Sequence, residues 1–529
     1  MKLKKYGFFL ASLGLLASCA NENIDGPNTP EQADGEVYLT LNLSQVGTRA
    51  DGDNGTPTGE AGTLPGTSEE SKISNVLIVI TDANDESKIT KYASTVSGNT
   101  VSFTLTGNDF LALQALPTAH VYAVCNLGSG DYPEPTGCSN AMQRVMSLSN
   151  DDNTYWTNDY FLMSNAEANE VTIDVVKVKN GEFTSTSPLS LGTVKVQRTM
   201  ARLDVSKGQP TVELPTGNDN ISLTLDGLTL VNKSKNFFLY KEVGSGSSFS
   251  LFAAEMYDGN NENDATKTNY VNDPKASVTT YTTDHLFNLA TSQTAAQQTY
   301  VTDWFGSDAN SSSITYDIWN YVNPNTVIDK DQQVNGKSTG IIFRAKFTGT
   351  GLSGLLTAGD GNNLYVYRNK VYGDLAKLKA TLATPATQDD QALKAIYESL
   401  TSEISDKTAE ADIISALLED KDFQIFPADE AGKGKDASFH CYYYYWIRHN
   451  GVGSNVDGVM HPMEFGVVRN NVYKLAVTKL SGFGKPGNYT PNGIDPDDPP
   501  HTPETAENAT IKVALEVLPW GVRTDNIEF

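Results

Sequence analysis

The chain has 529 residues, of which 39% are hydrophobic and 19% are charged, and its 39 basic and 64 acidic residues give a formal net charge of −25. A single hydrophobic core rarely grows past about 250–300 residues, so this length predicts two folded domains. The composition excludes wholesale disorder, and the negative charge argues against nucleic acid and anionic lipid headgroups as partners.

The N-terminus has the layout of a bacterial export signal. Three lysines precede an apolar run that is too short to span a membrane as a mature helix, and this run ends in Leu16-Ala17-Ser18-Cys19. The ending matches a lipobox, where the chain is cut before a cysteine that takes lipid on its sulfur. We expect residues 1–18 to be a lipoprotein signal peptide and Cys19 to be lipidated, so that only this lipid contacts the membrane. The alternative is an ordinary signal peptide with a chance cysteine.

The polar stretch at residues 20–35 has the composition of a flexible tether. It is followed by a run in which apolar and polar residues alternate. The apolar positions of this run share one face and are Val37, Leu39, Leu41 and Leu43. Period-two alternation of this kind predicts a half-buried strand.

One basic residue follows this strand. Arg49 is the only lysine or arginine between Lys5 and Lys72, and Ala50 begins a polar, glycine-rich run. Exposed loops of this composition are preferred sites of proteolysis. We expect an Arg-specific protease to cut between Arg49 and Ala50 and to remove residues 19–49, which comprise the tether and the strand. Taken alone, Arg49 also fits an ordinary solvated loop residue.

The body of the chain shows strand-like runs separated by turn signals, which is typical of sandwich domains. These runs are residues 75–80, 100–105, 119–125, 171–178, 194–205, 221–231, 340–347, 363–367, 439–447 and 467–480. Helical periodicity appears at 373–382, 391–400 and 409–418. We expect a mainly β fold with an N-terminal β-sandwich at 50–208 and a C-terminal β-sandwich at 209–490 that carries the helices as insertions.

No pattern in the sequence indicates catalysis. The only histidine cluster, His440, His449 and His461 with Cys441, lacks the regular spacing of zinc ligands. Motifs for a nucleophile elbow, a zinc protease, a P-loop or a dinucleotide site do not occur. We therefore predict no enzyme activity, no catalytic residue, no metal and no cofactor. Cys125 and Cys138 are close enough in sequence to pair, and this question stays open.

The C-terminus repeats the pattern of the first strand. A proline- and aspartate-rich linker, residues 491–508, precedes a segment at 509–529. The apolar face of this segment is Ile511, Val513, Leu515 and Val517, with Trp520 as a further anchor. If the first strand is cut away, it leaves a groove that the C-terminal strand of a second molecule can fill. Such head-to-tail contacts do not close on themselves and build filaments. The alternative is that this strand folds back into its own chain.

These features together resemble the Bacteroidales fimbrillins, the shaft subunits of type V pili, and most of all the Mfa-type major fimbrial subunit. The resemblance is carried by the lipobox, by the strand that ends before Arg49, and by three segments. These are VQRTMARLDV at 196–205, VVRNNVYKLAV at 467–477 and VALEVLPW at 513–520.

The resemblance implies two transthyretin-like β-sandwich domains, export as an outer-membrane lipoprotein precursor, cleavage after Arg49, and polymerisation through the C-terminal strand. The implied partners are identical subunits head to tail, minor anchor and tip fimbrial proteins, and an Arg-specific protease. The implied role of the mature protein is adhesion and biofilm formation on the cell surface. The alternatives are a fimbrial tip subunit and a monomeric surface lipoprotein that binds a host protein or glycan.

Overall fold

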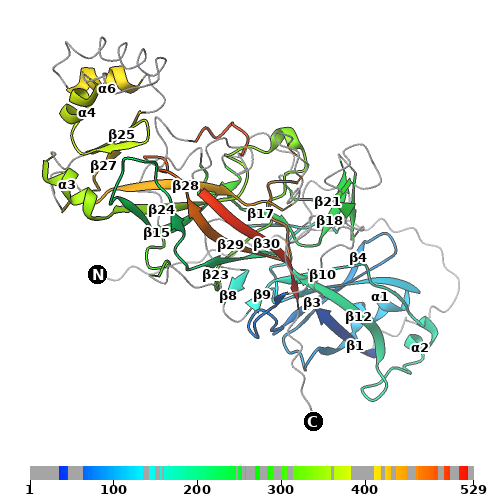
Figure 1. The fold of residues 1–529 in the computed structure, drawn as a ribbon. Helices are drawn as coiled ribbons and strands as arrows, with labels where there is room; N and C mark the ends of the chain where they lie inside the picture. The colour runs from blue at the N-terminus through cyan, green and yellow to red at the C-terminus, as the bar shows by residue number, and fades with distance from the viewer. Residues whose placement is uncertain are drawn as a thin grey trace, which may run out of the picture.

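The structure is a computed structural model of the full chain. It describes residues 35–45, 64–134, 142–148, 155–157, 160–245, 248–252, 256–257, 268–274, 283–289, 300–306, 314–358, 363–382, 410–418, 423–429, 436–449, 460, 463–486, 494–500 and 511–521. Over these residues the fold is mainly β, as predicted (Figure 1). None of the helices in these ranges has the length and apolar character needed to cross a membrane.

The N-terminal part is built on one sheet of eight strands, here called the first sheet. Seven of them follow one another across the sheet in the order β4 (Ser87–Ala93), β3 (Val76–Thr81), β6 (Thr118–Cys125), β10 (Met163–Asn165), β12 (Leu189–Arg198), β1 (Glu36–Gln45) and β5 (Thr100–Thr106). The eighth, β11 (Glu170–Thr172), pairs with β6. Two helices, α1 (Gly107–Gln114) and α2 (Val175–Lys179), contribute Phe110, Leu113 and Val178 to the core of this sheet.

The central part consists of two sheets that share one core. The second sheet has the order β2 (Leu64–Pro65), β30 (Ile511–Gly521), β29 (Asn471–Leu480), β13 (Ala201–Ser206) and β23 (Tyr316–Val322), with β14 (Thr211–Val212) also paired to β29. The third sheet has the order β15 (Ser222–Val231), β24 (Gly340–Thr348) and β28 (His440–Trp446). Leu203 and Leu475 of the second sheet and Phe343 of the third lie in the same buried cluster.

An insertion follows β24 and forms a small unit of its own at one end of the molecule (Figure 1). It contains α3 (Thr350–Ala358), the sheet β26 (Lys370–Tyr372), β25 (Asn363–Tyr367) and β27 (Phe423–Pro427), and the helices α4 (Leu375–Leu382) and α6 (Glu410–Leu418). Tyr365, Leu378 and Leu417 are buried together in a separate cluster. The insertion therefore has its own hydrophobic core.

Shorter strands connect these parts. A four-stranded sheet has the order β19 (Ser248–Leu251), β18 (Glu242–Ser245), β21 (Thr268–Val271) and β20 (Met256–Tyr257). Three two-stranded ribbons pair β16 (Lys233–Ser234) with β22 (His285–Leu286), β17 (Asn236–Phe238) with β7 (Val145–Ser147), and β8 (Trp156–Thr157) with β9 (Tyr160–Phe161). A short 3₁₀ turn covers Lys330–Gln332.

Most strand predictions are confirmed, but two of the predicted runs are not single strands. The run at 171–178 is not one strand, because β11 ends at Thr172 and helix α2 begins at Val175. The Asp174 carboxylate accepts a hydrogen bond from the Lys177 backbone N–H at 3.1 Å and caps this helix. The run at 194–205 is two strands, β12 and β13, which belong to different sheets. The expected helix at 391–400 lies outside the described residues.

Along this part of the chain, Met200 belongs to the core cluster of the first sheet and Ala201 to the cluster of the second and third sheets, although Phe237, Leu239, Tyr240 and Val472 also join the first cluster. The chain therefore passes from the first sheet to the second within the short link from β12 to β13.

Candidate functional site

Strand β1 lies inside the first sheet rather than at its edge. It pairs antiparallel with β5 over seven residue pairs and parallel with β12 over six. Both edges of β1 therefore carry ladder hydrogen bonds. Removal of this strand would expose the facing edges of β5 and β12 at once.

The apolar face of β1 supplies part of the core. Val37, Leu39, Leu41 and Leu43 are all at most 3% exposed, whereas Asn42 on the other face is exposed. The four positions that the sequence grouped on one face thus share the core of the first sheet.

Two local features fix how β1 sits. The register against β12 shifts between Thr40 and Asn42, next to Gly192, whose φ of +77° is in the left-handed region that favours glycine. At the entry of the strand, a Cβ added at Gly35 would overlap the ring of Phe110 from α1. The position of Gly35, just before β1, therefore has no room for a side chain.

The C-terminal strand β30 occupies an outer place in the second sheet. It pairs antiparallel with β29 of its own chain over nine residue pairs, from Asn471–Pro519 to Leu480–Ile511. Within the described residues, its other edge pairs with β2, where Leu64 lies opposite Trp520 and Pro65 opposite Gly521. Ile511 is buried and Val513 is half-buried against the shared core. In this structure β30 is folded back onto its own chain, which is the alternative that the sequence left open.

The beginning of the proline- and aspartate-rich linker is held by the body of the protein. The Asn335 side-chain amide donates to the Asp495 carbonyl at 2.9 Å, and the Asn335 backbone N–H donates to the Asp498 carbonyl at 2.8 Å. The Gly336 N–H donates to the Pro496 carbonyl at 2.8 Å. The described part of the linker is therefore docked on the loop around Asn335.

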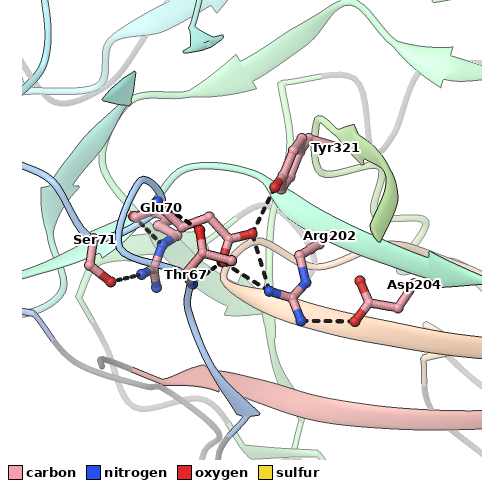
Figure 2. A network of polar contacts seen from close by, with 7 residues as sticks. Thr67, Glu70, Ser71, Arg202, Asp204 and Tyr321 are labelled. Atoms are coloured by element: carbon pink, nitrogen blue, oxygen red, sulfur yellow. Dashed lines mark hydrogen bonds and ion pairs between the residues drawn. The ribbon is translucent and has the colours of Figure 1, made fainter. Parts of the chain in front are cut away.

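A buried polar network lies where the first and second sheets meet (Figure 2). Its centre is the Glu70 carboxylate, which is 1% exposed. Arg202 Nη1 donates to both of its oxygens at 3.1 and 2.9 Å, and the Tyr321 hydroxyl donates at 2.7 Å. The Thr67 backbone N–H adds a bond of 2.6 Å, while Arg202 Nη2 donates to Asp204 at 2.8 Å.

Arg198 binds the backbone on the other side of the same turn. Its Nε donates to the Glu70 carbonyl at 3.0 Å, and its Nη2 donates to Ser71 Oγ at 3.1 Å. The next contact along the turn comes from β1, since Gln45 Nε2 donates to the Ser71 carbonyl at 2.5 Å. The segment around Glu70 thus touches the end of β1, the end of β12 and the start of β13.

Burial and charge act against each other in this network. Burial lowers the pKa of Arg198 to about 10. Burial opposes the charge of Arg202 as well, but the carboxylates of Glu70 and Asp204 outweigh it and raise the pKa of Arg202. Burial raises the pKa of Asp204 despite Arg202, and burial together with the charge of Glu70 raises the pKa of Tyr321. Each charge depends on its partner, because an isolated buried charge is costly.

Some predicted site residues cannot be placed. Cys19, Arg49 and Ala50 lie outside the described residues, and of Leu515, Val517 and Trp520 the structure describes only the backbone of β30. Cys125 is a buried free thiol, and burial raises its pKa to about 12. Cys138 lies outside the described part.

The histidine cluster of the sequence does not come together as one site. His440 lies between Asp429, 2.9 Å from its Nδ1, and Asp226, 2.6 Å from its Nε2. His449 Nδ1 lies 2.8 Å from the Tyr473 hydroxyl, and His461 lies outside the described residues. Within the described part, no group of three or more metal-ligating side chains gathers.

The network around Glu70 was not predicted from the sequence. One signal was present, because Thr67 and Glu70 have the spacing of a capping box. The structure has this reciprocal pair, with the Glu70 N–H donating to Thr67 Oγ1 at 3.2 Å and the Thr67 N–H donating to the Glu70 carboxylate. Nothing in the local sequence, however, indicates that Arg198 and Arg202 are its partners.

Two family models match this chain. Residues 37–225 match the major fimbrial subunit protein FimA, and residues 437–526 match the C-terminal part of the type IV major fimbrial subunit protein, fimbrillin. The matched ranges together span more than half of the chain, and they include both β1 and β30. The chain belongs to the fimbrillin family. This fimbrillin is therefore a fimbrial subunit of the cell surface.

Solved structures of similar proteins include two fimbrial proteins of Porphyromonas gingivalis. The fimbrilin FimA has 14% identity and a TM-score of 0.39, and the comparison covers 93% of this chain and all of FimA. The tip fimbrial protein Mfa3, solved with a C-terminal truncation, has 13% identity and a TM-score of 0.31, with 92% of this chain and all of Mfa3 covered. Both scores are low, so the family assignment rests on the two family models. A search of curated proteins found no significant match.

Proposed function

We propose that this fimbrillin is a shaft subunit that polymerises head to tail when its first strand is removed and replaced by the C-terminal strand of a neighbour. The observation that supports this most is the position of β1 between β5 and β12, with paired backbone on both edges. A strand removed from such a position leaves an apolar groove with two rows of unpaired backbone groups. An open edge of this kind is a template for an incoming strand.

Processing would prepare the subunit for this exchange. The precursor is exported, lipidated at Cys19 and held at the outer membrane by that lipid. An Arg-specific protease then cuts between Arg49 and Ala50, and residues 19–49 leave with β1. The mature protein begins at Ala50 and is no longer attached to the membrane.

Strand pairing favours the exchange. Among the described residues, β30 forms nine residue pairs with β29 along one edge and two with β2 along the other. In the groove it would pair along both edges, as β1 does. Burial of four aliphatic side chains, such as those of β1, contributes about 6–12 kcal/mol before entropy costs. The alternating face at Ile511, Val513, Leu515 and Val517 has the spacing of the face that it would replace.

The presence of both a groove and a donor strand supports a place in the shaft. Each subunit can then accept one strand and donate another, so it joins two neighbours and the chain of subunits continues. Identical subunits are the main partners in this proposal, with anchor and tip fimbrial proteins at the two ends. The fibre would serve adhesion and biofilm formation.

One observation favours a second candidate, a monomeric surface lipoprotein. Strand β30 already has a place in its own chain, opposite β29. A subunit that kept this arrangement would have no strand to donate. The two candidates predict different forms of the protein at the cell surface, a trimmed polymer or an intact lipidated monomer.

The test is to shear protein from cells, sequence its N-terminus and run it without boiling on a denaturing gel. The proposal expects a start at Ala50 and a ladder of resistant oligomers that disappears when residues 511–529 are deleted. A lipidated chain that starts at Cys19 and runs as a single band would contradict it. Arg49→Lys serves as a control, since it removes the site of an Arg-specific protease but keeps a site for a trypsin-like one.

A further inference from the structure

The segment that follows the expected cleavage region is fixed tightly to the protein. Thr67 and Glu70 close a turn through their reciprocal capping-box bonds, and two backbone bonds, Ser71 N–H to the Ser68 carbonyl and Lys72 N–H to the Glu69 carbonyl, continue it. Side chains from elsewhere in the chain then bind both the Glu70 carboxylate and the backbone around it (Figure 2).

These side chains come from two sheets. Arg198 is the last residue of β12 in the first sheet, whereas Arg202 in β13 and Tyr321 in β23 belong to the second sheet. Arg198 and Arg202 are 1% and 4% exposed. The Glu70 turn is therefore held from both sides of the junction, by contacts that do not involve β1.

A side-chain hydrogen bond joins this turn to β1. Gln45 Nε2 donates to the Ser71 carbonyl. On the other side of the turn, β2 pairs with the end of β30. The turn thus lies between the strand that would leave and the strand that would be donated.

We propose that the Glu70 cluster is a retention anchor, which keeps residues 64–72 docked at the junction of the first and second sheets when β1 leaves. The inference rests on the proposed function in one respect, the loss of β1. Because Arg198, Arg202 and Tyr321 all remain in the mature chain, the turn keeps its contacts after Gln45 has gone. Glu70 acts here as a positioning residue.

The test is hydrogen exchange, followed by mass spectrometry, on the protein before and after β1 has been removed by cleavage at Arg49. The anchor predicts that amides of residues 66–72 keep their protection in the trimmed wild-type protein. Glu70→Gln loses the charge but keeps the shape, and it is expected to speed exchange in 66–72 by about tenfold or more, since a hydrogen bond to a charged group is lost. Exchange in the third sheet should not change.

Controls separate this role from a general effect on folding. Glu69→Gln changes the exposed neighbour, whose carboxylate accepts from Ser68 Oγ at 2.9 Å, and is expected to change exchange at 66–72 far less than Glu70→Gln does. If Glu70→Gln does not fold, Tyr321→Phe removes one hydroxyl from the cluster and is expected to speed exchange locally by a smaller factor. The anchor is overturned if 66–72 lose their protection when β1 leaves the wild type, or if Glu70→Gln exchanges no faster there than Glu69→Gln.

Gel ladders report the proposed function separately. Trimmed protein that forms ladders while residues 66–72 exchange freely would contradict the anchor alone. Trimmed protein that stays monomeric with 66–72 protected would contradict the polymerisation alone.

Discussion

Gln45, the last residue of β1, donates its side-chain amide to the backbone carbonyl of Ser71 at 2.5 Å, although 26 positions separate the two residues in sequence. The chain therefore leaves the first sheet and returns to it at one place. The segment between these two residues contains Arg49, β2 and the Glu70 turn. A cut at Arg49 would separate β1 covalently from the Glu70 turn, and release of β1 would break the hydrogen bond between Gln45 and Ser71.

The core position of Leu41 predicts a difference between precursor and mature protein. Leu41 is fully buried, so Leu41→Ala is expected to lower the free energy of unfolding of the precursor by about 2–5 kcal/mol. The fibre should be unaffected, because the strand is absent from it. Urea unfolding of the precursor measures the first effect. Asn42→Ala, on the exposed face of the same strand, should change the stability by much less.

Gly35 offers a second test of how β1 is seated. A side chain at this position would overlap the Phe110 ring, so Gly35→Ala is expected to destabilise the precursor by about 1–3 kcal/mol. Phe110→Leu in the same chain should recover part of the loss by making room. An unchanged midpoint of urea unfolding in Gly35→Ala would show that the entry of the strand is looser than the structure has it.

The cap of helix α2 predicts a small and specific loss. Asp174→Ala removes the acceptor for the Lys177 N–H and is expected to cost about 0.5–2 kcal/mol of stability, toward the lower end because the side chain is about half exposed. Asp174→Asn keeps an acceptor oxygen and should lose less. Thermal unfolding of the two variants side by side compares them.

Two buried carboxyl groups predict how stability changes with pH. Burial raises the pKa of both Glu242 and Asp273 to about 7, against hydrogen bonds from Gln143 and Thr326 and the charge of Arg469. The folded state therefore holds protons that the unfolded state has released above about pH 4, so stability falls as pH rises from about 4 to about 7 and then levels off.

The variant Glu242→Gln isolates one of these groups. Its loss of stability between pH 5 and pH 8 should be smaller than that of the wild type by up to about 2 kcal/mol. Urea unfolding at the two pH values measures this difference. Glu182→Gln, at an exposed position, should leave the pH dependence as it is in the wild type. Equal losses in Glu242→Gln and in the wild type would contradict the raised pKa.

Alternation along the sequence was enough to predict the apolar face of β1, because four aliphatic residues at every second position can be buried only on one side of a strand. The same pattern could not tell where β30 lies. Its apolar face suits the place beside β29 and the groove of β1 alike, and the partner of a strand is decided by contacts far away in sequence.

Other features needed the folded structure for different reasons. The valines from Val175 to Val178 look like a strand, but in the structure they belong to a helix that Asp174 caps. Glu70 lies in a polar turn where a charged residue is ordinarily solvated, so its burial could not be predicted before Arg198 and Arg202 were placed beside it.

The most direct test of strand exchange is a disulfide trap between subunits. Leu41 of β1 lies opposite Val101 of β5, so a donor strand in the groove would bring one of its central residues to the same place. Trimmed protein with Val101→Cys and Leu515→Cys, in a Cys138→Ser background, would be allowed to assemble and then be oxidised. A parallel sample would carry Val513→Cys, which takes this position if the donor strand runs the opposite way.

Strand exchange predicts a reducible ladder of covalent oligomers in one of these two samples, and no ladder with Ala514→Cys, because alternation turns that residue to the other face. Assembled fibres that give only monomers after oxidation in both samples would contradict it.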